Sequence, residues 1–422
     1  MANDYDVIVI GGGPAGSAAA GLLAKAGRSV LVLEKEKFPR YHVGESLVPG
    51  AIPVLEELGV RDILEAGYLR KYGTTLRWGA ERDLWTIRFA EVGPIEFAYE
   101  VKRAEFDTVL LTRARELGAT VIEEATVTEP LFDGERCTGV RYRLGRQGSP
   151  AEAHARYVID ASGQSKLLAH RENLIDWHED LRNIAVWSYF QGGEQFPGTD
   201  RGNILTEYHG NGWVWVIPFS DGTRSVGFVG PNDLFVQSGL TPEQYFASHF
   251  EATSEAKRLL AGATRIADFR VTKDWSYTAT RFCGPGYVMI GDAAAFVDPL
   301  FSTGVMLALK SASVAAATVG AILDNPEREA DYQKGFEHSY RDFFDTVVSF
   351  VRYFYDARRQ RVAYWSRAQE LIDPVRELEQ RADFIRLVSG LAGGLEVMQT
   401  PDSVREAADL AAAASEPAPE PA

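Results

Sequence analysis

The sequence predicts an α/β protein with a doubly wound parallel sheet, an inserted antiparallel sheet and a helical C-terminal region. A strand–helix–strand pattern opens the chain, an aromatic segment of alternating polarity fills its middle, and residues 326–398 show almost unbroken helical periodicity. The 422 residues are enough for two packed regions around one large core.

The placement of these patterns assigns a range to each part. The doubly wound domain is discontinuous in this prediction, because its signals occur both early and late in the chain. It takes residues 1–180 and 270–325, the antiparallel substrate-domain segment takes 181–269, the helical region takes 326–400, and a disordered tail takes 411–422.

The first elements are the most clearly marked. Residues 6–10 predict a strand, 14–26 a helix that Gly27 ends, and 29–33 a second strand, which together form a βαβ unit with a right-handed crossover. Further along, the sequence predicts a helix over 105–118, strands over 121–127, 137–142 and 157–159, antiparallel strands within 182–231, a strand over 287–290 and a long helix from Gly304.

The composition excludes several classes of protein. There are 59 acidic against 44 basic residues, a formal charge of −15, which disfavours nucleic-acid and anionic-membrane partners. Two distant cysteines, Cys137 and Cys283, exclude a disulfide scaffold and a multi-cysteine metal site. The N-terminus lacks the pattern of a signal peptide. The longest apolar stretch, 304–323, is interrupted by Lys310 and predicts a buried helix. We therefore expect a cytoplasmic protein without a metal.

Glycines after the first strand predict a dinucleotide site. Gly11, Gly13 and Gly16 have the GxGxxG spacing, with Ala15 between the last two. This pattern permits a tight turn, a close approach of a pyrophosphate to the backbone, and close packing of helix on strand. Glu34 ends the second strand, where a carboxylate can accept hydrogen bonds from a ribose diol. A Rossmann-like nucleotide-binding unit is the prediction.

Two later strand ends favour FAD over NAD. Asp160-Ala-Ser-Gly and Gly291-Asp-Ala each follow a β-run, and an aspartate there suits a polyol chain such as ribityl. The arrangement resembles the FAD-binding fold of the p-hydroxybenzoate hydroxylase class over nearly the whole chain. The resemblance implies an FAD-binding domain whose Gly13, Ala15, Gly16 and Glu34 hold the adenosine half, with Arg40, Ser46 and Arg103 along the pyrophosphate or flavin ring and Asp292 at the ribityl chain.

Residues 213–218, Trp-Val-Trp-Val-Ile-Pro, match the WxWxIP signature of the flavin-dependent halogenases. Tryptophans two residues apart place both indoles on one face of a strand. The resemblance implies that Trp213 and Trp215 form a bulky wall beside the flavin and the substrate tunnel. An ordinary aromatic core stripe is the alternative.

Lys71 lies in a segment that resembles the KxG…WG segment holding the catalytic lysine of those halogenases. A lysine can offer a hydrogen bond or, if burial lowers its pKa, a nucleophilic amine to hypochlorous acid. The alternative is a solvated surface lysine.

Residues 298–305, Asp-Pro-Leu-Phe-Ser-Thr-Gly-Val, lead into a helix whose N-terminal N–H groups can bind an anion. By the same resemblance Thr303 and Gly304 would bind chloride, and Val305 would lie near the flavin ring. We also expect Ser302 or Thr303 to cap the helix through its side chain.

The resemblance implies an FADH2-dependent halogenase. In that family reduced FAD and O2 give a hydroperoxide, which oxidises chloride or bromide to hypohalous acid. No second nucleotide motif for NAD(P)H is evident, so a separate flavin reductase is the expected partner. Where tryptophan-type enzymes carry a glutamate before the Ser-Thr-Gly turn, this chain has Phe301. A phenol or pyrrole, free or tethered to an acyl or peptidyl carrier protein, is therefore the expected substrate.

Three alternatives share parts of the pattern. An FAD-dependent aromatic monooxygenase would have the same fold without needing Lys71. A geranylgeranyl-reductase-like enzyme would act on membrane lipids, which the acidic composition disfavours. A non-catalytic flavin-binding partner would not need the lysine either.

Overall fold

The computed structural model describes residues 4–145, 148–372, 380–392, 404–406 and 408–409. Its first sheet has the strand order β17-β18-β10-β1-β2-β7, in which β10, β1, β2, β7 and β18 run parallel. The strands are β1 (Tyr5–Ile10), β2 (Val30–Leu33), β7 (Thr120–Ile122), β10 (Pro150–Asp160), β17 (Cys283–Gly284) and β18 (Tyr287–Met289). Nearly every residue of β1 and β2 is buried, as in a parallel sheet covered on both faces.

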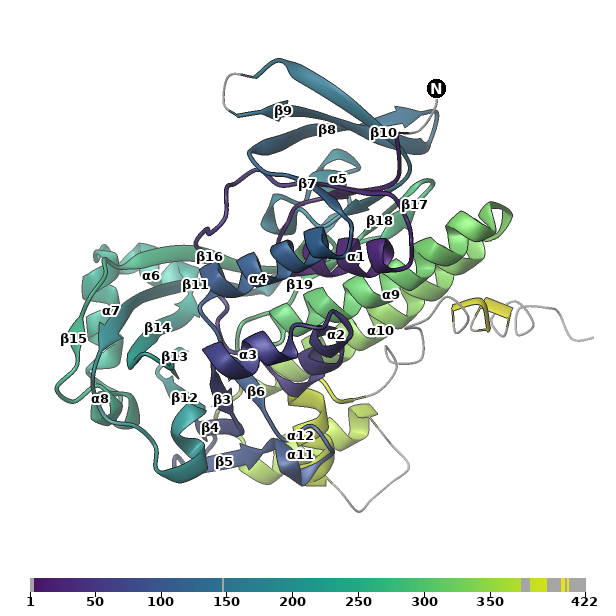
Figure 1. The fold of residues 1–422 in the computed structure, drawn as a ribbon. Helices are drawn as coiled ribbons and strands as arrows, with labels where there is room; N and C mark the ends of the chain where they lie inside the picture. Colours follow the sequence, from purple (N-terminus) through teal and green to yellow (C-terminus); the bar gives the residue numbers. More distant parts are fainter. Residues whose placement is uncertain (1–3, 146–147, 373–379, 393–403, 407, 410–422) are drawn as a thin grey trace, which may run out of the picture.

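Three helices pack together below this sheet: α1 (Pro14–Lys25), α4 (Arg103–Glu116) and α9 (Gly304–Asp324). The hairpin β8 (Ala125–Asp133) and β9 (Arg136–Leu144), joined to β10, lies on the side away from α9 (Figure 1). By length and composition α9 could cross a membrane, but its most apolar window is wholly buried inside the protein. It is therefore a core helix, as predicted.

The strand predicted over 121–127 is interrupted. Glu124 has φ +56°, in the left-handed region, and the chain turns there. The first half becomes the edge of the parallel sheet and the second half enters the hairpin. The turn falls at the second of two adjacent glutamates, Glu123 and Glu124, in the middle of the predicted strand.

The second sheet has the order β19-β16-β11-β14-β13-β12-β4-β5, with β15 paired to β11. It uses more of the chain than residues 181–269, because β4 and β5 come from the early part and β16 and β19 from the late part. Its strands are β4 (Gly73–Arg77), β5 (Leu84–Arg88), β11 (Ile175–Gln191), β12 (Ile204–His209), β13 (Gly212–Pro218), β14 (Thr223–Pro231), β15 (Thr264–Arg265), β16 (Arg270–Ala279) and β19 (Ala295–Phe296).

Strand β13 separates two apolar cores. Trp213, Trp215 and Ile217 face the main core, whereas Val214 and Val216 face a smaller one. Three short helices lie in the segment that follows the strands: α6 (Asn232–Ser238), α7 (Pro242–Phe250) and α8 (Glu255–Leu259). Residues of α7 and α8 complete the smaller core and cover that face of the sheet. The opposite face, which carries Trp213 and Trp215, is the one that faces the candidate site.

The C-terminal region is helical where it is described: α10 (Glu329–Phe354), α11 (Arg361–Ile372) and α12 (Gln380–Val388). Helices α11 and α12 lie beside β4 and β5 and beneath α2 (Ile52–Glu57) and α3 (Arg61–Gly67), whereas α10 runs alongside α9 (Figure 1). Residues 393–400 and the predicted tail 411–422 lie outside the described residues.

Candidate active site

The glycine turn after β1 is as tight as the motif requires. Gly11 has φ +98°, and a Cβ there would lie 2.5 Å from the Ala161 carbonyl oxygen. A Cβ on Gly16 would lie 1.9 Å from the Gly11 oxygen, so helix and strand could not pack as they do. Gly13 precedes the first turn of α1, with Ala15 buried inside it. A Cβ on Gly13 would meet only the Arg40 guanidinium, which leaves room for a pyrophosphate.

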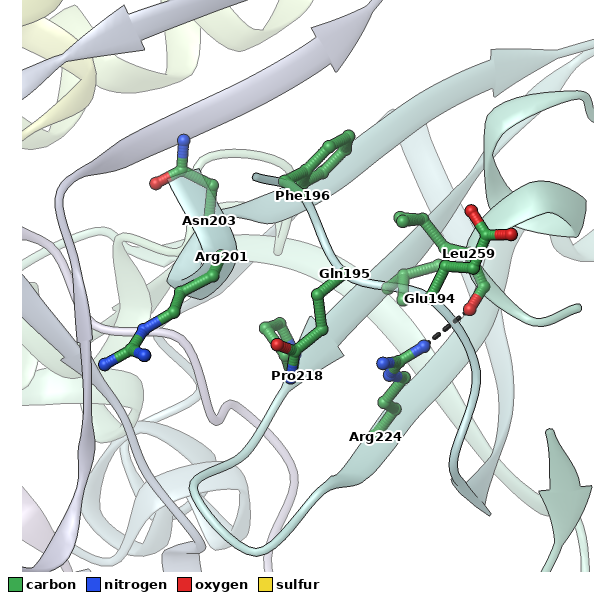
Figure 2. A pocket seen from close by; sticks show the side chains of 9 residues that line it. Glu194, Gln195, Phe196, Arg201, Asn203, Pro218, Arg224 and Leu259 are labelled. Atoms are coloured by element: carbon green, nitrogen blue, oxygen red, sulfur yellow. Dashed lines mark hydrogen bonds between the residues drawn. The ribbon is translucent and has the colours of Figure 1, made fainter. Parts of the chain in front are cut away.

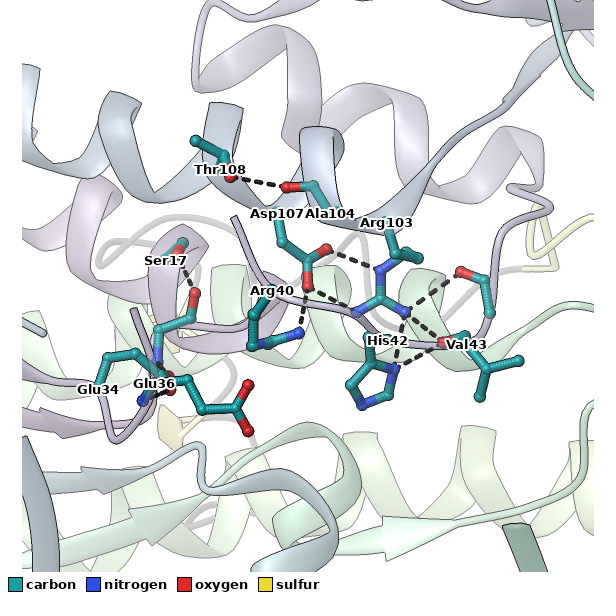
Figure 3. Close-up of polar contacts among 12 residues, drawn as sticks. Ser17, Glu34, Glu36, Arg40, His42, Val43, Arg103, Ala104, Asp107 and Thr108 are labelled. Atoms are coloured by element: carbon teal, nitrogen blue, oxygen red, sulfur yellow. Dashed lines mark hydrogen bonds and ion pairs between the residues drawn. The ribbon is translucent and has the colours of Figure 1, made fainter. Parts of the chain in front are cut away.

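Glu34 faces this turn from the end of β2. One carboxylate oxygen accepts the Gly12 N–H at 2.6 Å and the other accepts the Glu36 N–H at 2.8 Å. The side chain is buried beside the turn, and both oxygens keep further acceptor capacity (Figure 3). This is the arrangement expected of a ribose-binding carboxylate.

Arg103, Asp107 and Arg40 form a buried ion cluster (Figure 3). Arg103 donates to both Asp107 oxygens, at 2.7 and 3.0 Å, and Arg40 pairs with the same carboxylate at 3.1 Å. Arg103 also donates to the carbonyl oxygens of Val43 and Gly44. Arg40 thus reaches the start of α1, whereas Arg103 holds the loop that leads to Ser46.

The two strand-end aspartates differ in role. Asp160 is fully buried and accepts the N–H groups of Ser162 and Leu168, so it organises the chain after β10. Asp292 is bonded by the Gln164 amide at 3.1 Å. Burial raises the pKa of Asp292, and the charges of Arg103 and Lys166 oppose this shift. Asp292 therefore remains the candidate for a ribityl contact.

Lys71 is fully buried, which contradicts the surface alternative. It ends β3 (Leu69–Lys71), which pairs with β6 (Ala98–Glu100). Its ammonium donates to the Ser46 hydroxyl at 2.7 Å and to the Leu47 carbonyl oxygen at 3.0 Å. Burial lowers the pKa of Lys71 to about 8, and the Glu100 carboxylate opposes this shift. The sequence placed Ser46 along the cofactor; the structure shows its hydroxyl bound to Lys71.

Sequence reasoning missed two buried carboxyls beside the lysine. Ser46 donates to Glu100 at 3.0 Å, and Tyr189 donates to Glu45. Burial raises the pKa of Glu100 to about 8 and that of Glu45 to about 7. Glu45 stands next to Ser46 in the sequence, which could have drawn attention to it. Glu100 lies in a three-residue strand with no signal of its own.

The two tryptophans share one face of β13, as predicted, with ring centroids 5.9 Å apart. Trp213 donates its indole N–H to the Tyr355 hydroxyl at 3.1 Å, and Trp215 donates to the Ser225 hydroxyl at 3.1 Å. Tyr355 in turn donates to Asp298 at 2.9 Å. The tryptophan wall is therefore bonded to the segment that leads into α9.

The expected side-chain cap of α9 is wrong. Thr303 occupies the N-cap position, but no cap bond comes from its side chain, and Ser302 lies in the left-handed region with φ +58°. Val305 is buried in the first turn. A Cβ on Gly304 would meet nothing within 4 Å, so this helix start faces open space. Among the described residues no side chain caps its N–H groups, and uncapped N–H groups at a helix start can bind an anion.

A small pocket lies between the strand that follows Lys71 and the turn before α9. It reaches across β4, β5 and β12 to α12, and none of its nine lining residues is charged: Thr74, Leu76, Ile87, Ile204, Leu300, Phe301, Ser302, Phe384 and Val388. Figure 2 shows another small pocket, lined by Glu194, Arg201 and Arg224 among others. None of the predicted site residues lines that second pocket.

The nucleotide cradle, the strand-end aspartates and the large mixed sheet define a flavoprotein of the FAD-dependent oxidoreductase class. The family model for tryptophan halogenase matches residues 6–95 and 89–407. The chain belongs to the flavin-dependent halogenases, enzymes that use FAD with a halide and O2 to halogenate aromatic rings. This supports halogenation over the hydroxylase, reductase and non-catalytic alternatives.

Two relatives cover most of the chain. A tryptophan 2-halogenase from Chondromyces crocatus is 33% identical over 398 residues, 91% of this chain and 75% of the relative. A 1H-pyrrole-2-carbonyl-(peptidyl-carrier protein) chlorinase from Pseudomonas fluorescens is 32% identical and covers 98% of this chain and 95% of the relative.

Solved structures agree in fold. The myxobacterial chondrochloren halogenase CndH has a TM-score of 0.80 at 34% identity and covers 98% of both chains. The flavin-dependent brominase Bmp2 has a TM-score of 0.81 at 27% identity and covers 97% of this chain and 100% of its own.

Proposed function

We propose that this enzyme halogenates an uncharged, electron-rich aromatic ring, a phenol or a pyrrole, with Lys71 as the catalytic residue. The observation that carries the proposal is the uncharged cavity between the β4 strand and the Ser302–Thr303 turn, with Phe301 in its lining. A ring without a carboxylate or ammonium fits such a lining, because an unpaired buried charge would be costly.

The cofactor residues are proposed by their place around the glycine turn. Gly11, Gly13, Ala15 and Gly16 would admit the pyrophosphate, Glu34 the ribose, Arg40 the phosphate charge and Asp292 the ribityl chain, while Arg103, Ser46 and Val305 would lie towards the flavin end. When bound in its reduced form, FAD supplies the activation of O2 that halide oxidation needs. Thr303 and Gly304 would hold the chloride or bromide through their backbone N–H groups.

Lys71 suits the delivery of the halogen, since its ammonium has three hydrogens and two hydrogen-bond acceptors among the described residues. The remaining N–H, or the lone pair of the amine, can engage hypohalous acid. Trp213 and Trp215 would keep the aromatic substrate away from the flavin. The substrate is free or carried on a carrier protein, as in the name of the pyrrole relative.

The family depends on a separate flavin reductase, and we propose that such a reductase supplies this chain in the cytoplasm. Two free, buried cysteines, Cys137 and Cys283, fit that reducing compartment.

The test is mass spectrometry of turnover mixtures containing FAD, NADH, a flavin reductase and chloride. Phenols, free pyrroles and a carrier-tethered pyrrole are compared, with Lys71→Met in parallel. We expect a product with one chlorine for hydrogen from the wild type and none from the variant, while both bind FAD equally. A product heavier by one oxygen that persists without chloride would refute the proposal.

A further inference from the structure

We propose that Glu100 is a positioning residue that sets the charge of Lys71 through the hydroxyl of Ser46. This inference rests on the proposed role of Lys71 in halogenation. It concerns a carboxylate that no sequence motif marks and that lies on a different strand from the lysine.

The geometry places a hydroxyl between the two charged groups. Lys71 donates to Ser46 at 2.7 Å, and Ser46 donates to Glu100 at 3.0 Å. The paired strands β3 and β6 and a bridge between Ser46 and Glu100 fix all three backbones. A serine hydroxyl has one proton to give and can accept another, so it can hold both neighbours at once.

All three side chains are buried, with exposed fractions of 0%, 4% and 1% for Lys71, Ser46 and Glu100. One Glu100 oxygen accepts from Ser46, and the other has no hydrogen-bond partner among the described residues. A buried carboxylate with a free oxygen is costly unless a nearby positive charge or a proton compensates it. Lys71 is the cation that faces it.

Burial brings the pKa values of the two groups close together. Burial lowers the pKa of Lys71 and raises that of Glu100, each to about 8, and each group's charge opposes the other's shift. Glu45 also faces Glu100 and raises its pKa further, while Arg103 and Lys102 face Glu45. The shared hydroxyl provides a route for a proton: Ser46 gives its proton to Glu100 and takes one from Lys71, and ammonium plus carboxylate become amine plus carboxylic acid.

The decisive measurement is the titration of Lys71 itself. The holoenzyme with oxidised FAD is labelled at lysine Cε with ¹³C, the Lys71 resonance is assigned by its loss in Lys71→Met, and its shift is followed against pH. In Glu100→Gln, which keeps the shape but removes the charge, we expect the Lys71 titration to move down by about one pH unit or more. Glu100→Asp keeps the charge and is expected to stay closer to the wild type.

Ser46 offers an independent pair of variants. Ser46→Ala removes the shared hydroxyl and is expected to shift the Lys71 titration downward as well, whereas Ser46→Thr keeps it. The exposed Glu105→Gln serves as a control for loss of a carboxylate on the following helix and is expected to change nothing. If Glu100→Gln fails to fold, the two Ser46 variants still decide the matter.

Turnover supplies the second readout. The limb of the kcat–pH profile that Lys71 controls is expected to move to lower pH in Glu100→Gln together with the ¹³C titration, with KM for the ring within about twofold. The double variant Glu100→Gln/Ser46→Ala is expected to move the limb no further than the larger single change, because the residues act as one unit.

An unchanged Lys71 titration in both Glu100→Gln and Ser46→Ala would overturn the inference. Failure of the proposed function has a different signature, since Lys71→Met would then still halogenate. An inactive Lys71→Met combined with a wild-type titration in Glu100→Gln would refute the role of Glu100 alone.

Discussion

At the scale of single residues, the candidate site combines glycines that have no room for a side chain with ionisable groups that are buried away from water. The glycines of the cofactor turn are of the first kind, and Lys71, Glu100 and Glu45 are of the second. Each kind leads to an expectation that a purified variant can test.

We expect Gly16→Ala to abolish FAD binding or folding. Its Cβ would lie 1.9 Å from the Gly11 carbonyl oxygen, and this obstacle is backbone, which cannot move aside as a flexible side chain can. Gly67→Ala is the matched control, since a Cβ there meets nothing within 4 Å; its stability should stay within about 0.5 kcal/mol. Flavin absorbance after gel filtration and thermal melting compare the two, and a Gly16→Ala variant with wild-type FAD content would contradict the expectation.

We expect the stability of the protein to depend on Glu45 between pH 4.5 and 7. Burial raises its pKa from 4.5 to about 7. The folded state thus binds the proton more tightly than the unfolded state, and this stabilisation is complete below pH 4.5 and is lost as pH rises through 7. In Glu45→Gln the fall in unfolding free energy across this window should be smaller by about 3 kcal/mol. Denaturant unfolding at several pH values measures it; equal slopes would be the contrary result.

At the scale of elements, one hydrogen-bonded chain joins three segments distant in sequence. Trp213 on β13 donates to Tyr355 after α10, and Tyr355 donates to Asp298 before the turn of α9. Asn183 on β11 donates to the same two acceptors. The tryptophan wall and the start of α9 are therefore held in one arrangement by side chains that no motif contains.

We expect Tyr355→Phe to cost about 1–3 kcal/mol, because Trp213 loses its acceptor and Asp298 loses a donor in a buried place. Halogenation should fall more than FAD binding, since the change touches the tryptophan wall and the proposed halide site before α9 and leaves the glycine turn after β1 unchanged. Tyr245→Phe is the control, because it removes a buried hydroxyl that has no hydrogen-bond partner among the described residues and lies in the smaller core. Equal losses of FAD affinity and turnover in Tyr355→Phe would contradict the expectation.

The sequence could predict those elements in which apolar residues repeat at a regular short spacing. The βαβ unit, the shared face of Trp213 and Trp215 and the buried helix from Gly304 follow from spacings of two or about four residues. The parallel pairing of Ile204–His209 with Gly73–Arg77 has no such signal, because more than a hundred residues separate the strands. Glu100 was missed for a related reason. A single glutamate in a short strand is expected to be solvent-exposed, and only the tertiary contacts show that it is buried beside Ser46.

At the scale of the whole molecule, the proposed substrate pocket forms where separate parts of the chain converge. The second sheet contributes Thr74 and Ile204, the turn before α9 contributes Phe301, and the C-terminal helix α12 contributes Phe384 and Val388. Phe301 also packs against Phe350 and Phe354 of α10, with ring centroids 5.5 and 4.9 Å apart. The proposed function therefore makes substrate preference depend on how the C-terminal helices pack on the second sheet, and cofactor binding depend on the first sheet.

This separation gives a whole-molecule test with Phe384→Leu. The smaller side chain widens the cavity at α12, so we expect a higher KM for a small phenol or pyrrole, by about threefold to tenfold, and better turnover of a ring with an added substituent. FAD affinity should not change, because α12 contributes nothing to the nucleotide cradle among the described residues. Phe336→Leu on α10 is the matched control: it removes the same atoms from a fully buried position outside the cavity lining. It should lower the melting temperature to a similar extent while leaving KM unchanged. Equal increases in KM in both variants would mean that weaker core packing alone causes the effect. That result would contradict the assignment of this pocket as the substrate site.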